Sequence, residues 1–287
     1  MDEIDHALAT LAAADPMEVI RRGWPVQKRH YYSTLNDPVW LRDNQDLWRP
    51  PLVPADIDWD IPGQLRTAAE VGAFAPELAD IPKAEPPECK DQGCAQYHWH
   101  NPFFNSADGV VWYGLVRSRK PARVVEVGCG WSSLLLARAL EQNARDTGAA
   151  STQVTQIEPF PNERVFAMLP PHWARHRVPI QRAPLEPFDA LRAGDVLFYD
   201  GSHTAHVASD VCWMLFRILP RLRAGVLIHF HDIFFPRDYP PSWIFDRLQT
   251  WNEQYLVQAL LMNSRAYRVV LASALLAELH APEVRAL

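Results

Sequence analysis

Cysteine is scarce in this chain of 287 residues, which contains four of them, and they are scattered. Four cysteines are too few for a disulfide framework in a chain this long, and they agree with a reducing compartment. Long apolar runs are also missing, since none approaches the roughly 18 residues that a membrane span requires. The N-terminus, MDEIDHALAT, has neither the basic region nor the apolar region of a signal peptide. We therefore predict a cytoplasmic protein that has no membrane partner.

Positive charge is limited as well. The net charge is −6 and the isoelectric point is about 6.0, and no block of lysine and arginine is longer than residues 117–120. Binding of nucleic acid through counterion release needs a concentration of basic residues that this chain does not have. No basic groove with interleaved aromatic residues is evident either. The expected partner is a small molecule and not a nucleic acid.

Residues 1–100 have little hydrophobic periodicity, and they are rich in proline and tryptophan. This composition predicts an irregular but ordered extension with short helices, because disordered segments rarely carry many aromatic residues. Such an extension can serve as a lid, a substrate arm or a dimer arm, which leaves a homo-oligomer open. The remaining residues, 101–287, are expected to form the catalytic domain.

From Pro121 onward, short apolar runs alternate with helical stretches, the pattern of βαβ units. Strands are predicted at residues 123–127, 153–157, 178–181, 196–199, 225–230 and 267–271. Helices are predicted at residues 132–145, 162–168, 206–222, 243–248 and 252–262. This order predicts a doubly wound α/β domain with a mostly parallel sheet and helices on both faces.

A glycine turn joins the first strand to its helix, with the sequence Glu126-Val127-Gly128-Cys129-Gly130-Trp131-Ser132-Ser133. Glycines let the backbone approach a ligand closely, and a helix N-terminus offers free N–H donors. A dinucleotide site requires a third glycine, but Ser133 stands at that position. The Glu126 carboxylate suits a cationic ligand better than a pyrophosphate. The turn therefore favours a cofactor with a positively charged end.

The next polar cluster follows the second strand, at Glu158-Pro159. An acid at this strand end can accept hydrogen bonds from both hydroxyls of a ribose. Later strands end in Tyr199-Asp200-Gly201-Ser202-His203 and in His229-Phe230-His231-Asp232. All these clusters lie just beyond the carboxyl ends of predicted parallel strands, where open α/β sheets bind their ligands.

These motifs, together with the continuation His231-Asp232-Ile233-Phe234-Phe235-Pro236, resemble class I methyltransferases of the methyltransferase-24 type. The likeness extends from Tyr97 to Ala272 and implies a Rossmann-like sheet with S-adenosylmethionine as methyl donor. It also implies cofactor contacts from residues of the glycine turn (Glu126, Gly128, Cys129, Gly130 and Ser132), from Glu158 and Pro159, and from Asp200 and Ser202. It further suggests that the segments 101–104 and 251–253 shape the substrate pocket.

One feature departs from that family. Its sheets normally close with a seventh, antiparallel strand, whereas residues 275–287 of this chain read as a helix and a tail. The order of the sheet and the oligomeric state therefore stay open, while the cofactor site is unaffected.

The residues Asp200, His203, His231 and Asp232 are the candidates for catalysis. A histidine that titrates near neutral pH can take the proton of a methyl acceptor, so either His203 or His231 can be a general base; either can equally be a structural residue that fixes its loop. The same four residues offer the two-histidine, one-carboxylate set that binds divalent metals. Histidine ligands favour iron, manganese or zinc over magnesium, which prefers oxygen ligands.

Two further cysteine patterns are interpreted as structural. The group Cys89, Cys94, His98 and His100 is too compressed for a usual zinc motif, which favours an ordinary loop. Cys129 is interpreted as a small residue that fits the glycine turn and not as a nucleophile.

Three classes of function remain. The leading one is a methyltransferase acting on a hydroxyl, carboxyl or amine of a small molecule, with oxygen favoured by the resemblance. The alternatives are an oxidoreductase or hydroxylase that uses NAD or a metal on the same sheet, and a cofactor-binding interaction protein without turnover.

Overall fold

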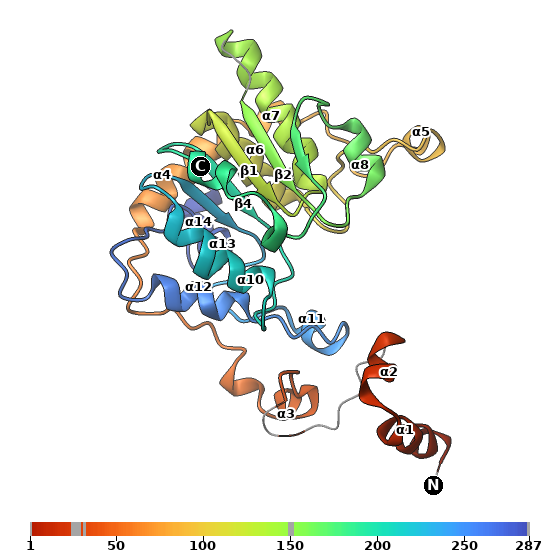
Figure 1. The fold of residues 1–287 in the computed structure, drawn as a ribbon. Coiled ribbons are helices and arrows are strands. Elements are labelled where there is room, and N and C mark those ends of the chain that lie inside the picture. Colours follow the sequence, from red (N-terminus) through yellow and green to blue (C-terminus); the bar gives the residue numbers. More distant parts are fainter. Residues whose placement is uncertain (1, 24–29, 31–32, 149–151, 286–287) are drawn as a thin grey trace. The chain divides into compact units, whose positions relative to one another are not determined.

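The computed structural model describes residues 2–23, 30, 33–148 and 152–285 (Figure 1). Contacts divide the chain into a small unit, residues 1–44 and 240–250, and a large unit, residues 45–239 and 251–287. Across the described residues, no helix combines the length and the apolar character needed to cross a membrane.

The small unit consists of short helices. These are α1 (Glu3–Ala13), α2 (Pro16–Arg21), α3 (Pro38–Asp43) and α11 (Pro241–Phe245). The first three begin with an aspartate whose side chain accepts hydrogen bonds from free N–H groups of the first turn. The guanidinium of Arg42 lies 5.2 Å above the ring of Phe245 and so links α3 to α11.

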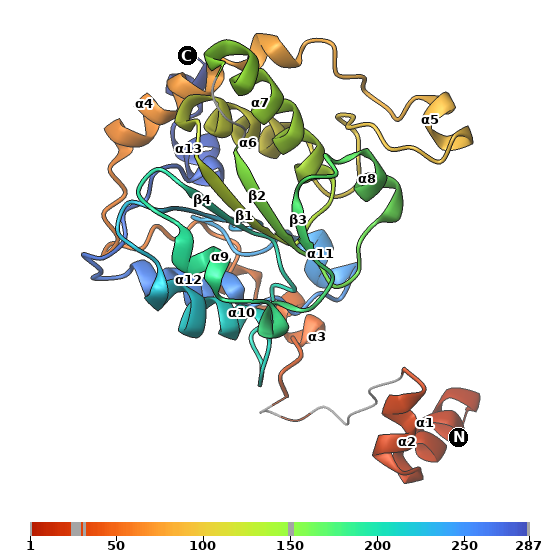
Figure 2. The ribbon, with the colours of Figure 1, turned by 45° about the horizontal axis from the view of Figure 1, so that its top comes forward.

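The large unit is built on five parallel strands in the order β3-β2-β1-β4-β5 (Figure 2). The strands are β1 (Arg123–Val127), β2 (Gln153–Ile157), β3 (Ala174–His176), β4 (Val196–Tyr199) and β5 (Leu227–Phe230). Four of the six predicted strands are confirmed, and the predicted Rossmann-like α/β fold with them.

Helices cover both faces of this sheet (Figure 2). The helices of the large unit are α4 (Ile61–Gly72), α5 (Pro87–Asp91), α6 (Ser106–Arg119), α7 (Trp131–Thr147), α8 (Glu163–Met168), α9 (Glu186–Ala190), α10 (Asp210–Trp213), α12 (Glu253–Leu261), α13 (Ser273–Leu279) and α14 (Ala281–Arg285). Apolar residues of α6, α7 and α8 pack on one face, and those of α9, α10 and α12 pack on the other.

Alternate side chains of the central strands supply the two cores. Val124 of β1 and Phe198 of β4 join the core under α6 and α7, whereas Val125 and Leu197 join the opposite core. A strand that is buried on both faces carries a continuous apolar run and not an alternating one. This explains why the sequence of β1 and β4 lacks the period of two.

Residues 45–100 pack with the sheet in the large unit. Leu78, Ile81 and Tyr97 belong to the core under α6 and α7, and α4 packs along α6. Gly114 of α6 makes this close approach possible, because a Cβ atom there would lie 2.5 Å from the carbonyl oxygen of Val71. The functional division at residue 100 stays a prediction.

The third strand lies elsewhere than predicted. Residues 178–181 were expected to form it, but residues 174–176 pair with β2, and Ile180–Arg182 form a 3₁₀ turn. Pro179 explains the difference, since proline has no N–H to donate to a strand ladder.

The predicted long helix at residues 206–222 is broken into three pieces. An α-helical turn at 210–213 passes into a π-helical segment at 214–218 and a 3₁₀ turn at 219–221. The helix begins late because Ser209 caps it by accepting a hydrogen bond from the N–H of Cys212. It tightens at its end because Pro220 cannot donate an intrahelical hydrogen bond.

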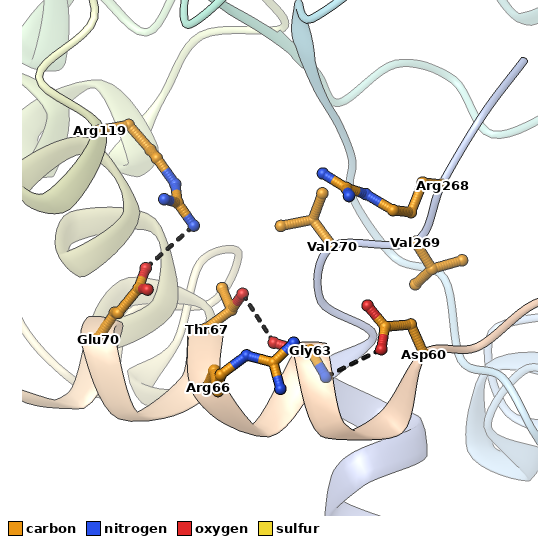
Figure 3. A pocket seen from close by; sticks show the side chains of 9 residues that line it. All are labelled: Asp60, Gly63, Arg66, Thr67, Glu70, Arg119, Arg268, Val269 and Val270. Atoms are coloured by element: carbon orange, nitrogen blue, oxygen red, sulfur yellow. Dashed lines mark hydrogen bonds and ion pairs between the residues drawn. The ribbon is translucent and has the colours of Figure 1, made fainter.

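The predicted strand at residues 267–271 is also wrong. This segment lies near α4 in space. Its residues Val269 and Val270 line a polar hollow of about 170 Å³ together with Arg66 and Arg119 (Figure 3). The N–H of Ala272 donates to Oε1 of the buried Gln64 of α4, so its partner is a side chain and not the sheet edge. No antiparallel strand pairs with the sheet within the described residues. A helix and a tail were expected at residues 275–287, of which residues 286 and 287 lie outside the described part of the chain.

A buried arginine holds α6 in place. Arg117 is 3% exposed, and its guanidinium donates to both carboxylate oxygens of Glu77, at 2.7 and 2.9 Å, and to Asp146, at 2.6 Å. It therefore ties α6 to the segment before it and to α7.

Replacing Arg117 with alanine is expected to lower the free energy of unfolding by about 1.5–3 kcal/mol, because the buried guanidinium no longer donates hydrogen bonds to the half-exposed carboxylates of Glu77 and Asp146. The matched control is Arg119→Ala, which breaks an exposed pair with Glu70 at 3.1 Å and should cost less than about 1 kcal/mol. Urea unfolding of the two variants measures both effects. Equal losses would show that the Arg117 pairs add nothing beyond a surface ion pair.

Candidate functional site

The register of the sheet brings the predicted clusters to one edge. Val127 at the end of β1 pairs with Ile157 of β2 and with Tyr199 of β4, and Tyr199 pairs with Phe230 of β5. The ladder continues one residue further, since the N–H groups of Gly128, Asp200 and His231 donate to neighbouring strand ends at 2.9–3.1 Å. The four strand ends therefore open into the same region.

Gly128 and Asp200 are in direct backbone contact at this edge. Gly128 has a φ of +80°, a conformation that side chains disfavour. A Cβ atom built on it would lie 1.7 Å from the carbonyl oxygen of Asp200. A side chain cannot fit there, so the glycine is required by the close approach of β1 and β4.

Gly130 is different, although it belongs to the same turn. Its φ is −170°, which any residue can adopt, and a Cβ atom built on it would meet nothing within 4 Å. The second glycine thus faces open space at the N-terminus of α7, where N–H groups of the first turn have no helical partner. An open cradle of this kind fits a cofactor.

Glu126 points into the protein and not into that open space. Its carboxylate is fully buried and accepts hydrogen bonds from the hydroxyls of Ser132 and Ser133, at 2.9 and 2.8 Å, and from Nε2 of Gln156, at 2.8 Å. Its contact with the methionine end of the cofactor stays a prediction. In the structure, Glu126 joins the end of β1 to the first turn of α7.

Burial raises the pKa of Glu126 to about 7, against the lowering effect of the hydrogen bonds from Gln156, Ser133 and Ser132. The folded protein therefore binds the proton of the Glu126 carboxyl more tightly than the unfolded chain does, where the pKa of this group is 4.5. Stability falls as the pH rises from 4.5 to 7, by about 3 kcal/mol for a shift of this size.

We expect Glu126→Gln to remove this pH-dependent loss of stability, because glutamine does not ionise. Urea unfolding at pH 5 and pH 8 measures it, with Glu163→Gln on the exposed start of α8 as the control. If both variants lose as much stability between pH 5 and pH 8 as the parent protein does, Glu126 is not the cause of this loss.

Glu158 lies at the end of β2 and organises the glycine turn from the other side. Its Oε2 accepts a hydrogen bond from the N–H of Cys129 at 3.0 Å, and its Oε1 accepts one from the N–H of Phe160 at 2.7 Å. Glu158 and Pro159 are half-buried. A carboxylate oxygen accepts more than one hydrogen bond, so Glu158 retains acceptor capacity for hydroxyl groups of a ligand.

Cys129 shows no sign of nucleophilic reactivity. Its thiol lies 3.6 Å from the carbonyl oxygen of Glu126, and burial and the nearby carboxylates of Glu126 and Glu158 raise its pKa well above the usual value. A thiolate is the reactive form, so a raised pKa argues against a nucleophile.

A second cluster forms beyond β4 and β5. Ligand atoms of Asp200, His231 and Asp232 all lie within 4.8 Å of one another, the only such group that could hold a metal ion among the described residues. The ring of His231 is buried and packs against Phe104 and Phe198, at 5.0 and 6.5 Å between ring centroids. Two carboxylates and an imidazole fit a divalent transition metal better than magnesium.

His203 stands beside this group and not within it. Its Nε2 lies 3.2 Å from Asp200 Oδ1 and 3.7 Å from Asp232 Oδ2, while its Nδ1 lies 2.8 Å from Oε2 of Glu253. Burial lowers the pKa of His203, but Asp200 and Glu253 outweigh it and raise the pKa to about 10. Both ring nitrogens are therefore engaged with carboxylates.

Carboxylates dominate the electrostatics of the cluster. The pKa of Asp200 is lowered, since His203 and His231 outweigh the effect of its burial. Burial raises the pKa of Asp108 on α6, of Asp232 and of Glu253. Such a surplus of acids around two imidazoles is suited to a cation.

Ser202 serves the loop between β4 and α10. Its N–H donates to Oδ2 of Asp210 at 2.7 Å, and its hydroxyl donates to Oδ1 of the same residue at 2.5 Å. The predicted contact of Ser202 with the cofactor stays a prediction.

The four residues considered for zinc do not form a metal group. His98 bonds through Nδ1 to the carbonyl oxygen of Gln96 at 3.0 Å, and its ring meets Trp131 edge-on at 4.8 Å. Cys89 is buried and Cys94 is half-buried, and both thiols are free. Cys89 lies in the short helix α5, whereas the other three residues lie in the segment that follows it, so the predicted loop holds for those three.

Two residues of the site carried little or no signal in the sequence. Glu253 was singled out only through the resemblance of the segment 251–253, and Asp108 was not identified. From sequence alone, a single acidic residue in a helix, such as Asp108, cannot be distinguished from one that is exposed to solvent. Proximity to His231 becomes visible only once α6 is packed on the sheet.

The model of a methyltransferase domain family matches residues 125–233, which run from β1 to the residues just after β5. Residues 125–233 form a class I methyltransferase domain. The match includes the glycine turn, Glu158 and all three residues of the metal-ligand group. The methyl donor expected for such a domain is S-adenosylmethionine. Neither a curated protein nor a solved structure matched the chain.

The position of Ser133 in this domain argues against the alternative of an NAD site. Ser133, where a dinucleotide site has its third glycine, is fully buried and bonded to Glu126 and to the N–H of Gly130. That serine fills the space that the fingerprint leaves open for close packing beside a pyrophosphate.

Proposed function

We propose that this methyltransferase domain transfers a methyl group to an oxygen of a small molecule with the help of a divalent metal. The observation that carries the proposal is the group Asp200, His231 and Asp232, which adjoins the glycine turn through the contact between Gly128 and Asp200. A cofactor cradle and a cation site thus share one edge of the sheet. Oxygen as the methylated atom is supported by the family resemblance.

The cofactor would be held by the glycine turn and by Glu158. S-adenosylmethionine supplies a methyl group on a positively charged sulfur. Gly130 leaves room for it, the first turn of α7 offers N–H donors, and Glu158 offers acceptors for ribose hydroxyls. The acids around Asp200 favour its positive charge.

Asp200, His231 and Asp232 would hold the metal, with manganese, iron or zinc preferred to magnesium. A divalent ion lowers the pKa of a hydroxyl that binds it, which makes the oxygen a better nucleophile. By holding such an ion, the same residues would also orient the acceptor, and orientation accounts for much of the acceleration in such reactions.

The contacts favour His203 as a residue that orients Asp200 and not as the general base. Both of its ring nitrogens already face carboxylates, which leaves neither for the proton of an acceptor. His231 has one carboxylate oxygen in ion-pair contact with its Nε2, Asp232 Oδ1 at 3.6 Å, and it shares the group with Asp200 and Asp232, so we assign it as a metal ligand.

Calorimetric titration of the metal-stripped protein tests the cofactor. S-adenosylmethionine and NAD are titrated separately, before and after addition of Mn²⁺, Fe²⁺, Zn²⁺ or Mg²⁺. We expect saturable binding of S-adenosylmethionine that Glu158→Ala abolishes, no binding of NAD, and no loss in the control variant Glu163→Ala. Binding of NAD alone, or of neither compound, would overturn the proposal.

Transfer is then followed with S-adenosylmethionine labelled in its methyl group and a panel of small hydroxyl, carboxyl and amine compounds. Label in an ether or ester that requires added metal supports the proposal. Label confined to amines, or equal transfer after chelation, contradicts the metal-assisted O-methylation. Binding without transfer to any compound favours an interaction protein.

A further inference from the structure

Three consecutive residues at the start of α12, Trp251, Asn252 and Glu253, hold the loop that follows β4. This loop, residues 200–205, carries Asp200 and His203. It belongs to the same unit as residues 251–253, although about 50 residues of sequence lie between them.

The backbone of the loop is held in an uncommon conformation. His203 has a φ of +57°, which is uncommon for a residue other than glycine and costs of order 1–3 kcal/mol. Its carbonyl oxygen accepts hydrogen bonds from the N–H groups of Asn252, at 3.0 Å, and Glu253, at 3.2 Å. Free N–H groups at the start of α12 therefore stabilise the conformation of the loop.

Side chains reinforce the same contact. The carbonyl oxygen of the Asn252 side chain accepts a hydrogen bond from the N–H of Ala205 at 2.6 Å. The indole of Trp251 packs on the ring of His203, with 4.1 Å between ring centroids. The imidazole is thus fixed on its face as well as at Nδ1.

Glu253 is placed in an unfavourable environment for a carboxylate. It is 1% exposed, and while its Oε2 is bonded to His203 Nδ1, its buried Oε1 has no hydrogen-bond partner in the described structure. An unsatisfied buried oxygen costs about 1–3 kcal/mol. A residue kept for packing alone would be better apolar, so the contact with His203 is the feature that accounts for this acid.

The chain of contacts ends at the proposed metal ligands. His203 Nε2 lies 3.2 Å from Asp200 Oδ1, so a ring fixed by Glu253 in turn fixes the Asp200 carboxylate. We propose that Glu253, supported by Trp251 and Asn252, is a positioning residue that orients Asp200 through His203. The proposal rests on the proposed function, because Asp200 is assigned there as a ligand. Hydrogen-bonded partners behind metal ligands typically change metal affinity or activity about 10- to 100-fold.

Two variants of the full chain test it, Glu253→Ala and Glu253→Gln, with Glu163→Ala in the first turn of α8 as the matched control. Mn²⁺ binding to the protein is measured by electron paramagnetic resonance, and binding of S-adenosylmethionine by calorimetry. We expect Glu253→Ala to weaken Mn²⁺ binding by about 10- to 100-fold, with binding of S-adenosylmethionine unchanged. Glu253→Gln keeps an oxygen that accepts from Nδ1 and should recover most of the loss.

The ring of His203 gives a readout that does not depend on a metal. Long-range ¹H–¹⁵N correlation spectra report the environment of Nδ1, which should shift in Glu253→Ala and return toward its original position in Glu253→Gln. If the parent protein binds no metal but this shift is seen, the proposed metal site is wrong, while the positioning role of Glu253 is supported. Unchanged His203 resonances together with unchanged Mn²⁺ affinity in Glu253→Ala overturn the positioning role.

Discussion

Gly128→Ala is expected to lower the affinity for S-adenosylmethionine by about 100-fold or more, since about 3 kcal/mol of strain and overlap corresponds to two powers of ten. The added methyl group would lie 1.7 Å from the carbonyl oxygen of Asp200, and the φ of +80° disfavours any side chain. The ends of β1 and β4 must then separate, which displaces the glycine turn and the loop carrying Asp200 together.

Gly130→Ala is the matched control in the same turn. A methyl group there meets no protein atom within 4 Å, so the thermal unfolding temperature should stay that of the parent protein. Calorimetry with S-adenosylmethionine should nevertheless show weaker binding, because the methyl group occupies space assigned to the cofactor. If Gly130→Ala binds normally, the cofactor does not use that space. If Gly128→Ala also binds normally, the close contact with Asp200 is not needed for the site.

Asp200→Asn is expected to lower Mn²⁺ affinity by more than about 100-fold, since losing a ligand should exceed the 10- to 100-fold cost of losing a partner behind one. Methyl transfer should fall with it in any acceptor assay that responds to metal. The substitution keeps the size of the side chain, so the backbone contact of residue 200 with Gly128 is preserved.

The control for Asp200→Asn is Asp189→Asn, which changes an exposed aspartate paired with Arg221 at 2.5 Å. It should leave Mn²⁺ binding and methyl transfer unchanged. Electron paramagnetic resonance titrations compare the two variants with the parent protein. Retention of Mn²⁺ binding in Asp200→Asn contradicts the assignment of this residue as a ligand.

The sheet edge is the part of the site that the sequence predicts well. Apolar runs located β1, β2, β4 and β5, and parallel pairing then requires the residues that follow them to meet at one edge. Gly128, Glu158, Asp200 and His231 all follow such runs. The spacing of polar residues after strands is enough to bring them together, even without knowledge of any side-chain contact.

The direction of individual side chains could not be predicted in the same way. The contacts of Glu126 inside the protein are one example: a strand alternates its side chains, and this one bonds to Ser133 and Gln156 on the buried face, which the sequence does not show. Its contact with the cofactor stays a prediction. His203 has a left-handed backbone conformation that depends on α12, a contact across about 50 residues of sequence. Local patterns carry no information on such a contact.

The wrong elements have local causes as well. The predicted strand at 178–181 contained Pro179, and the predicted helix at 206–222 contained Pro220, and each residue removes a backbone donor. The predicted strand at 267–271 failed for another reason, because its half-buried valines, Val269 and Val270, lie along a hollow lined by residues of α4 and not at the sheet edge. An apolar run indicates that a segment needs burial, but not which partner provides it.

The contact between Gly128 and the carbonyl oxygen of Asp200 also sets an order for biosynthesis. Asp200 follows Gly128 by 72 residues, so it leaves the ribosome about 4 to 14 s after Gly128 at typical elongation rates. During this interval the edge of β1 that later pairs with β4 is uncovered, and the glycine turn lacks its contact with the backbone of Asp200. A nascent chain should therefore acquire its cofactor only after β4 has been made.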